Sequence, residues 1–388
     1  MNHLTNQRSK FQLPDDIHYL NNAYMSPLLE RVARKGIEGL EQKYRPHEIG
    51  VDDFFQGAED IRTKFSVLIN NPEPDRIVLI PSVSYGMGIV ARNVSVHNKK
   101  IVIPGEQFPS NVYPWIELAK RDKARIEMVD PPESLTNRGL EWNEKILKAI
   151  DGNTSLVALG QIHWADGTLF DLESVRERCD EVGALLIIDG TQSVGALSFD
   201  LSQIRPDALV CAGYKCLLGH YGLGVAYFGP AFDNGVPLEE NWINREDSRD
   251  FAGLVKYKKN YEPGALRYEM GEHSNFVLVP MLQEALAQLN EWTPSRIQAY
   301  CASITEQPLK TLKKAGFWVE VPKQRSSHLF GIRHPEMDLN RLKTSLANKK
   351  IFVSIRGDAV RVSPHVYSYE MELELLVDIL CQSVKRYA

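Results

Sequence analysis

The stretch that decides the fold is Ala184-Leu-Leu-Ile-Ile-Asp-Gly-Thr-Gln-Ser-Val-Gly-Ala196, followed by Cys211-Ala-Gly-Tyr-Lys-Cys-Leu-Leu-Gly-His-Tyr-Gly-Leu-Gly-Val-Ala-Tyr-Phe228. Residues 185–188 are an apolar run without alternation, which is typical of a parallel strand buried on both faces. The run ends at Asp189, and ligands of open α/β sheets bind beyond the carboxyl ends of strands. A second apolar run, 208–212, leads to Lys215 in a loop bounded by glycines. Asp189 and Lys215 are therefore expected at the ligand-binding edge of an α/β sheet.

An aspartate and a lysine placed in this way suit pyridoxal phosphate (PLP). This cofactor needs a lysine amine for its Schiff base and a carboxylate on its pyridine nitrogen. The carboxylate keeps the nitrogen protonated, so that the ring is an electron sink for a carbanion at the substrate Cα. Apolar neighbours lower the pKa of a lysine and leave more of the free amine. The alternative is that Asp189 is a helix N-cap and Lys215 a structural lysine.

The sequence around Asp189 and Lys215 favours PLP binding. The segments Asp189-Gly-Thr-Gln-Ser-Val-Gly-Ala196, Ala212-Gly-Tyr-Lys-Cys-Leu-Leu-Gly219 and Gly222-Leu-Gly-Val-Ala-Tyr227, with Asp207, resemble the class V aminotransferase family of PLP enzymes. Cysteine desulfurases, kynureninases and isopenicillin N epimerase-like proteins belong to it. The resemblance implies the α/β fold type I of PLP enzymes, with a large, mostly parallel-sheet domain and a smaller C-terminal α+β domain. It also implies that Lys215 forms the Schiff base, Asp189 holds the pyridine nitrogen and Gln192 binds the phenolic oxygen.

The composition is that of an ordinary globular protein. The 388 residues are 43% apolar and 24% charged, and they can bury the core of two domains. A net charge of −5 argues against nucleic acid or an anionic membrane as the main partner. Five scattered cysteines are typical of free thiols in a reducing cytosol. The polar N-terminus and the short apolar runs predict neither a signal peptide nor a membrane span. We expect a cytoplasmic protein without a metal site.

The order of the elements predicts the domains. Strands alternating with helices from about Tyr19 to Phe228 indicate a doubly wound sheet. Loops follow Gly229, and a helix with apolar i, i+3, i+4 spacing at 279–291 begins the C-terminal part. There we expect strands at 318–321, 328–332, 351–355 and 359–362 and a closing helix from Tyr369. The predicted division is a loose N-terminal arm (1–16), a large PLP-binding domain (17–275) and a small C-terminal domain (276–388).

The first βα turn is an expected anion site. A strand at 76–80 and the residues Pro81-Ser-Val-Ser-Tyr-Gly86 lead into a helix. Free N–H groups and the helix dipole at its start favour an anion. The resemblance places the PLP phosphate on Val83 and Ser84, with Tyr214, although Ser82 or Ser84 can also be a simple N-cap.

A dinucleotide pattern overlaps this turn. Gly86-Met-Gly-Ile-Val-Ala91, with Glu106 further on, fits the G-x-G-x-x-A pattern of dinucleotide-binding folds. The first glycine of that pattern should follow its strand directly, whereas residues 81–85 intervene here. The glycines are therefore expected inside a helix, and NAD is not the favoured cofactor.

The family resemblance implies several further contacts. Phe108 is expected to stack on the pyridine ring, with Asn111 near the ring substituents. Ser274 and Asn275 are expected to reach the phosphate of the other subunit, in a homodimer with shared active sites. The residues expected beside the substrate are Asn22, Ala23 and Tyr24. Phe108 is otherwise a buried core residue, and 22–24 is otherwise a plain strand-to-helix turn.

An arginine near the C-terminus is the expected substrate anchor. Val360-Arg-Val-Ser-Pro-His-Val-Tyr367 is similar to the family segment whose arginine binds the substrate α-carboxylate. A guanidinium suits this task because its fork pairs with both carboxylate oxygens. Arg361 is the first candidate and Arg356 the second. The alternative is an arginine satisfied by a local acid such as Asp358.

The same region bears on the reaction. Cysteine desulfurases carry a nucleophilic cysteine on a mobile loop shortly before this arginine, whereas 351–360 contains no cysteine. Cys216 is expected to be packed rather than mobile, and Trp164 stands where desulfurases carry an asparagine. We therefore do not expect a persulfide-forming desulfurase. Transamination of an amino acid is the first expectation. Cα epimerisation and Cβ–S lysis are the alternatives, and a non-catalytic PLP-binding homologue is the alternative of another class.

Overall fold

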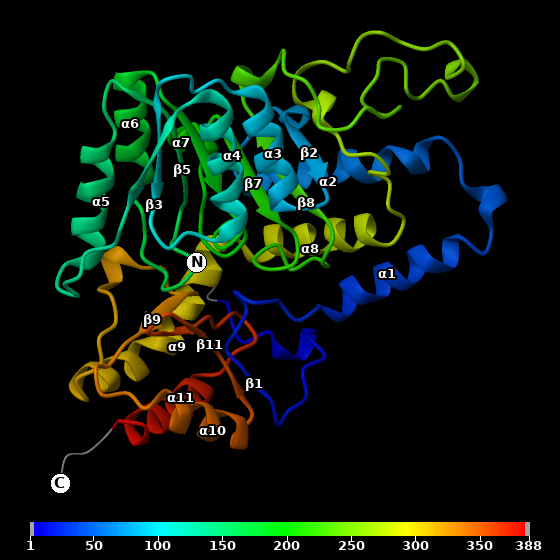
Figure 1. The fold of residues 1–388 in the computed structure, drawn as a ribbon. Coiled ribbons are helices and arrows are strands. Elements are labelled where there is room, and N and C mark those ends of the chain that lie inside the picture. Colours follow the sequence, from blue (N-terminus) through cyan, green and yellow to red (C-terminus); the bar gives the residue numbers. More distant parts are fainter. Residues whose placement is uncertain (1–3, 385–388) are drawn as a thin grey trace.

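A seven-stranded sheet forms the centre of the computed structural model, which describes residues 4–384 (Figure 1). The strand order is β2-β8-β7-β6-β5-β3-β4. The strands are β2 (Ile77–Ile80), β3 (Lys100–Pro104), β4 (Arg125–Val129), β5 (Thr154–Gly160), β6 (Leu185–Asp189), β7 (Ala208–Ala212) and β8 (Gly224–Phe228). Strand β8 is antiparallel to both of its neighbours, whereas the other pairs are parallel. The predicted α/β class is confirmed.

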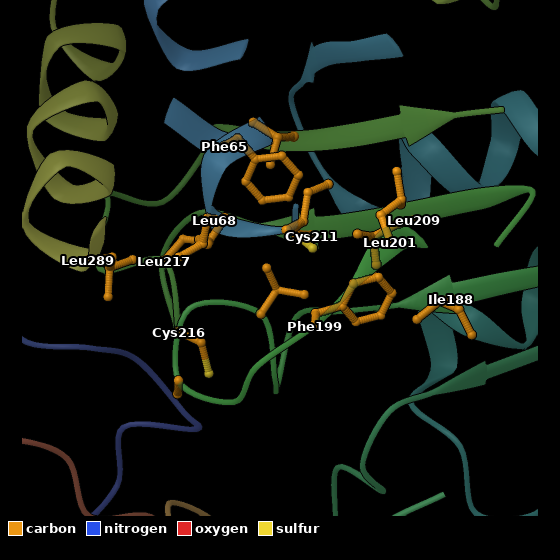
Figure 2. Close-up of a cluster of buried hydrophobic side chains, with 14 of the residues drawn as sticks. Phe65, Leu68, Ile188, Phe199, Leu201, Leu209, Cys211, Cys216, Leu217 and Leu289 are labelled. Atoms are coloured by element: carbon orange, nitrogen blue, oxygen red, sulfur yellow. The ribbon is translucent and has the colours of Figure 1, made fainter. Parts of the chain in front are cut away.

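Helices flank both faces of this sheet. They are α1 (Glu30–Gln42), α2 (Gln56–Leu68), α3 (Val83–Asn93), α4 (Tyr113–Asp122), α5 (Arg138–Ala149), α6 (Leu172–Val182), α7 (Leu201–Ile204) and α8 (Leu278–Trp292). Helix α1 packs on α8 rather than on the sheet. Because side chains of a strand alternate between faces, Ile77 and Leu79 join one core while Val78 and Ile80 join another. Figure 2 shows part of the first core, where Phe65 of α2 lies among side chains of the sheet.

The C-terminal part packs below the large sheet in Figure 1. It contains α9 (Pro294–Lys314), β9 (Phe330–Ile332), α10 (Leu339–Asn348), β10 (Ile351–Phe352), β11 (Ser354–Arg356), β12 (Ala359–Val362) and α11 (Glu370–Gln382). Strands β11, β12 and β9 form an antiparallel sheet over a third core. Strand β1 (His18–Tyr19) pairs with β10 in parallel. The N-terminal segment therefore joins the C-terminal part.

Two expectations about the C-terminal strands were wrong. Residues 318–321 form no strand, because Trp318 makes a single bridge to Arg333. The strand expected at 351–355 is divided into β10 and β11, which pair with different partners.

The limits of the predicted domains stay a prediction. Helix α8, just after the expected boundary at 275, packs against α1 and α2, and its apolar side chains belong to the first core. The arm is not loose over residues 4–16, since buried Arg8 bonds to Glu372 at 3.3 Å; residues 1–3 lie outside the described residues. Within the described chain, no helix has the length and apolar content needed to cross a bilayer.

Candidate active site

A cavity of about 190 Å³ lies at the carboxyl ends of β5, β6 and β7. Parallel strands end together at this edge, so the loops that follow them converge there. Of the residues predicted to bind the cofactor, the cavity is lined by Val83, Ser84, Phe108, Asp189, Gln192, Tyr214 and Lys215. Segments that are distant in the sequence therefore meet in one space.

Lys215 lies in the loop after β7 and is buried, with 7% of its surface exposed. Burial lowers the pKa of its amine to about 8, and the charges of Arg361 and Arg356 act in the same direction, while Asp189 opposes them. The amine nitrogen lies 5.4 Å from the centroid of the Phe108 ring and 5.4 Å from that of Tyr214. More of this amine is therefore unprotonated, and hence nucleophilic, near neutral pH than in an ordinary lysine.

Asp189 is the last residue of β6, and its carboxylate opens into the cavity. Burial raises its pKa, whereas hydrogen bonds from Thr191 and the charge of Lys215 lower it. The Thr191 N–H donates to Asp189 Oδ1 at 3.0 Å, and Thr191 Oγ1 accepts from the Ala212 N–H at 3.1 Å. Thr191 thus connects the turns after β6 and β7, a role that the sequence analysis missed.

The start of α3 forms one end of the cavity. Ser82 is its N-cap, because Ser82 Oγ accepts from the Tyr85 N–H at 3.2 Å. The Ser82 and Ser84 hydroxyls lie 2.9 Å apart. A serine N-cap and an anion site are compatible at this turn, since the first N–H groups of the helix and the serine hydroxyls are together suited to an anion.

Trp164 covers the cavity from the loop after β5. Its indole N–H donates to the Glu106 carbonyl oxygen at 2.7 Å, and its ring meets the edge of Phe108 at 5.3 Å and 77°. The guanidinium carbons of Arg356 and Arg361 lie 5.4 and 5.9 Å from the centroid of the indole. The sequence analysis had noted Trp164 only as a departure from the desulfurase pattern.

Arg361 is buried beside this tryptophan, with 1% of its surface exposed. Its Nη1 donates to the Trp164 carbonyl oxygen at 2.9 Å and its Nη2 to Ser354 Oγ at 3.3 Å, while Nε has no partner among the described residues. Burial, with a smaller effect from the charge of Arg356, lowers the pKa of Arg361 to about 9. Such a guanidinium is poised to receive an anion.

Asp358 does not satisfy either arginine. Its carboxylate pairs with Arg333 at 2.8 Å instead. Within residues 4–384, no carboxylate lies within ion-pair distance of Arg356 or Arg361. Neither guanidinium therefore has an acidic partner among the described residues; neither lines the cavity, and their contact with substrate stays a prediction.

The turn at 22–24 lies behind Gln192. The Gln192 side-chain N–H donates to the Ala23 carbonyl oxygen at 3.0 Å, and the Tyr367 hydroxyl donates to Asn22 Oδ1 at 3.2 Å. Asn22 and Ala23 are buried, whereas Tyr24 is 57% exposed. None of the three lines the cavity, so their contact with substrate stays a prediction, but Ala23 does hold Gln192.

Three other candidates lie outside the cavity wall. Asn111 is fully buried, and its Oδ1 accepts from the Trp115 indole at 3.0 Å, so its place near the cofactor ring stays a prediction. Asn275 Oδ1 accepts from the N–H groups of Val277 and Leu278 at the start of α8. The contact of Ser274 and Asn275 with a neighbouring subunit stays a prediction.

The donor set of the cavity fits PLP. The start of α3 suits a phosphate, Asp189 suits a protonated pyridine nitrogen, and the Lys215 amine suits the aldehyde. Gln192 Oε1 is buried without a partner among the described residues, so its amide is open to a polar group in the cavity. Asp189 forms no ion pair within the described chain, and its hydrogen bonds come from Thr191.

Comparisons with known proteins agree with this geometry. Residues 19–377 match the family described as Aminotransferase class-V. The "Uncharacterized aminotransferase YcbU" of Bacillus subtilis is 25% identical over 328 residues, which are 83% of this chain and 82% of that protein. A "Probable cysteine desulfurase" of Pyrococcus abyssi is 29% identical over 236 residues, which are 58% of this chain and 56% of that protein.

Solved structures share the fold over almost the whole chain. A C-DES variant with glycine covalently linked to its PLP cofactor superposes with a TM-score of 0.86 at 16% identity, covering 98% of this chain and 100% of that chain. The apo cysteine desulfurase of Thermococcus onnurineus has a TM-score of 0.80 at 20% identity, covering 97% of each chain. Since the family match spans nearly all of the sequence, this chain belongs to the class V aminotransferase family and is a PLP-dependent enzyme of fold type I.

Proposed function

We propose that this enzyme transaminates an α-amino acid, with Lys215 as the acid/base and Arg361 as the carboxylate anchor. The observation that carries the proposal is a cavity lined by Lys215, whose pKa is lowered, by Asp189 and by Trp164, against whose ring the buried Arg361 lies without an acidic partner among the described residues. Bound PLP supplies an electron sink that stabilises negative charge at the substrate Cα. Transamination needs one base that removes a proton at Cα and returns it elsewhere.

Lys215 has the chemistry for that proton transfer. Its pKa of about 8 is near the operating pH, so that its amine both accepts and returns a proton readily. Asp189 holds the pyridine nitrogen in its protonated form. In this proposal Val83, Ser84 and Tyr214 bind the phosphate, Phe108 stacks on the ring and Gln192 binds the phenolic oxygen.

Arg361 orients the substrate. Its buried fork lacks an acidic partner within the described residues, and its Nε is unsatisfied, so an entering α-carboxylate gains paired hydrogen bonds without displacing an internal acid. Arg356, on the same tryptophan, is the second candidate.

The relatives include both named activities. Proteins whose names say aminotransferase are YcbU and an uncharacterized aminotransferase of Schizosaccharomyces pombe that is 22% identical over 95% of this chain and 92% of its own. A probable cysteine desulfurase of Streptomyces coelicolor matches 79% of this chain and 72% of its own, so the proposal of transamination relies on the lack of a cysteine in 351–360. We also propose a cytoplasmic homodimer with shared sites, which agrees with five free thiols and with Ser274 and Asn275 lying outside the cavity of their own chain.

The reaction is tested by screening amino acids against the purified holoenzyme, with keto acid, ammonia, sulfide and protein persulfide measured together. We expect keto acid without sulfide or ammonia, and no persulfide with free cysteine. Four of the cysteines are buried and Cys381 is half-buried, and burial raises the pKa of Cys216 to about 12, so none offers a mobile thiolate.

Other outcomes of this screen reject transamination. Sulfide or ammonia in place of keto acid indicates Cβ–S lysis, and a change of Cα configuration alone indicates epimerisation. A persulfide that disappears when one cysteine is mutated indicates a desulfurase. No turnover of any amino acid indicates a non-catalytic homologue.

Lys215 is expected to bind the cofactor covalently. Purified holoenzyme should absorb in the visible, and borohydride should fix the cofactor on Lys215, as located by mass spectrometry. Because the free amine is the nucleophile, cofactor uptake by apoprotein should rise as the pH increases through about 8. Lys215→Ala should lose the visible band. A label on another lysine would overturn this assignment.

Asp189→Asn should bind PLP but lose most of its turnover, because a neutral amide does not hold the pyridine nitrogen protonated. Loss of a hydrogen bond to a charged group typically costs about 1.5–3 kcal/mol, so kcat should fall at least roughly tenfold. The retained cofactor, measured by absorbance, is the control for folding. Turnover close to that of the wild type would remove Asp189 from the mechanism.

Arg361→Ala should weaken the binding of amino acids far more than that of the matching amines. Truncating one partner of a buried charge pair costs about 2–5 kcal/mol, which is roughly 30-fold or more in affinity. The matched variant Arg356→Ala should lose less, because Arg356 is only half-buried. A larger loss in Arg356→Ala would move the anchor there. Unchanged affinity in both variants would reject a carboxylate-bearing substrate.

A further inference from the structure

A buried histidine outside the cavity holds the turn that carries Gln192. His328 precedes β9 in the C-terminal part and has 2% of its surface exposed. Its Nε2 lies 2.7 Å from the backbone carbonyl oxygen of Gln192, three residues after the end of β6. The contact therefore joins the C-terminal part to the cofactor side of the large sheet.

The hydrogen-bond network fixes which ring nitrogen carries the proton. Gln298 of α9 accepts through Oε1 from the Ser327 N–H at 2.9 Å, and its Nε2 donates to the Ala196 carbonyl oxygen at 2.7 Å. The same Nε2 lies 2.7 Å from His328 Nδ1. Since the amide can only donate there, Nδ1 must accept, and the hydrogen of a neutral ring is on Nε2.

The imidazole is therefore a neutral donor to Gln192. Its surroundings are consistent with this, because burial lowers the pKa of His328 to about 4, partly opposed by the bond to the Gln192 carbonyl. The neighbouring imidazole of His365 is also held neutral, with a pKa lowered to about 3 mainly by burial. His328 does not change its charge over the physiological pH range.

Gln192 is thus fastened at two points. His328 holds its backbone carbonyl, and the Ala23 carbonyl oxygen accepts its side-chain N–H at 3.0 Å. Nε2 keeps a second N–H, which is the donor that a phenolic oxygen needs, Oε1 is buried without a partner among the described residues, and the residue lines the cavity. Both fastenings come from outside the large sheet, so the position of the Gln192 amide depends on them.

We propose that His328, locked in one tautomer by Gln298, is a positioning residue that sets Gln192 against the cofactor. The inference rests on the proposed function in one respect, which is that Gln192 binds the cofactor. His328 itself touches neither substrate nor cofactor, because it does not line the cavity. Its effect must therefore appear in the properties of the bound cofactor, before any substrate is added.

The test compares His328→Met with His328→Gln in the holoenzyme. The two side chains have similar length and volume, but only glutamine can donate from a nitrogen at the position of Nε2. In His328→Met we expect the pH midpoint of the visible cofactor band to move by about half a unit or more, which is roughly a threefold change in proton affinity. We also expect PLP to dissociate about tenfold faster. His328→Gln should restore both values to within about twofold of the wild type.

His365→Met is the matched control, because His365 is a fully buried imidazole whose ring nitrogens have no hydrogen-bond partner among the described residues. It should lower thermal stability without moving the band. Any of three results would overturn the positioning role. The band does not move in His328→Met, or it moves equally in His328→Met and His328→Gln, or it moves as far in His365→Met as in His328→Met. If His328→Met does not fold, Gln298→Met leaves the imidazole in place and should move the band in the same direction; an unmoved band there overturns the role.

The same experiment separates this inference from the proposed function. A wild-type protein that takes up PLP without a visible band on Lys215 would reject the proposed function before any variant is compared. A normal wild-type band with no specific effect of His328 would reject only the positioning role.

Discussion

Two turns pressed together at the carboxyl ends of β6 and β7 determine the geometry of the cavity. Gly195, in the first turn, has φ +102°, and a Cβ there would lie 2.4 Å from the Cys216 carbonyl oxygen in the second. This approach is possible only for glycine. The Thr191 hydroxyl adds a hydrogen bond to the Ala212 N–H. The spacing of Asp189 and Lys215 is therefore set by backbone packing and does not rely on the flexible lysine stem.

This spacing creates an imbalance of charge. Around Lys215, two further cations, Arg356 and Arg361, act against one half-buried carboxylate, Asp189. Burial lowers the pKa values of Lys215 and Arg361, and the neighbouring positive charges lower them further. A cavity of this sign favours anionic ligands. A phosphate at the start of α3 and a carboxylate at Arg361 would balance the charge from opposite ends, and PLP with an amino acid provides both.

The sequence predicted those parts of the structure that depend on local patterns. Runs such as 185–188 are recognisable strands because both faces are buried and no alternation remains, and Ser82 is recognisable as a cap by its position before the helix. The failure of the expected strand at 351–355 had a tertiary cause, because that segment was divided between two pairing partners.

No pattern in the amino-acid sequence indicated the long-range contacts. Thr191 and His328 act through partners that the fold brings together, and a lone threonine or histidine in an apolar setting looks like any other core residue. Seven of the ten residues predicted to bind the cofactor line the cavity, because the family pattern places them directly. The residues that hold these cavity residues in place were not predictable, since they lie far from them in the sequence. His328, which binds the backbone of Gln192, is an example.

The availability of Arg361 is itself a product of such a network. Asp166 is buried near the Trp164 loop and pairs with Arg138 at 2.9 Å and with Arg333 at 3.0 Å. Burial alone would raise its pKa, but His163 and the two guanidiniums hold it well below its usual value. Arg333 also binds Asp358, the acid on the turn between the two candidate anchors. Arg333 thus fixes the Trp164 loop through Asp166. It also pairs with Asp358, the local carboxylate that would otherwise compete with substrate for Arg361. Asp358 is only three residues before Arg361 in the sequence, but it does not pair with Arg361. It pairs instead with Arg333, which the buried Asp166 holds beside it.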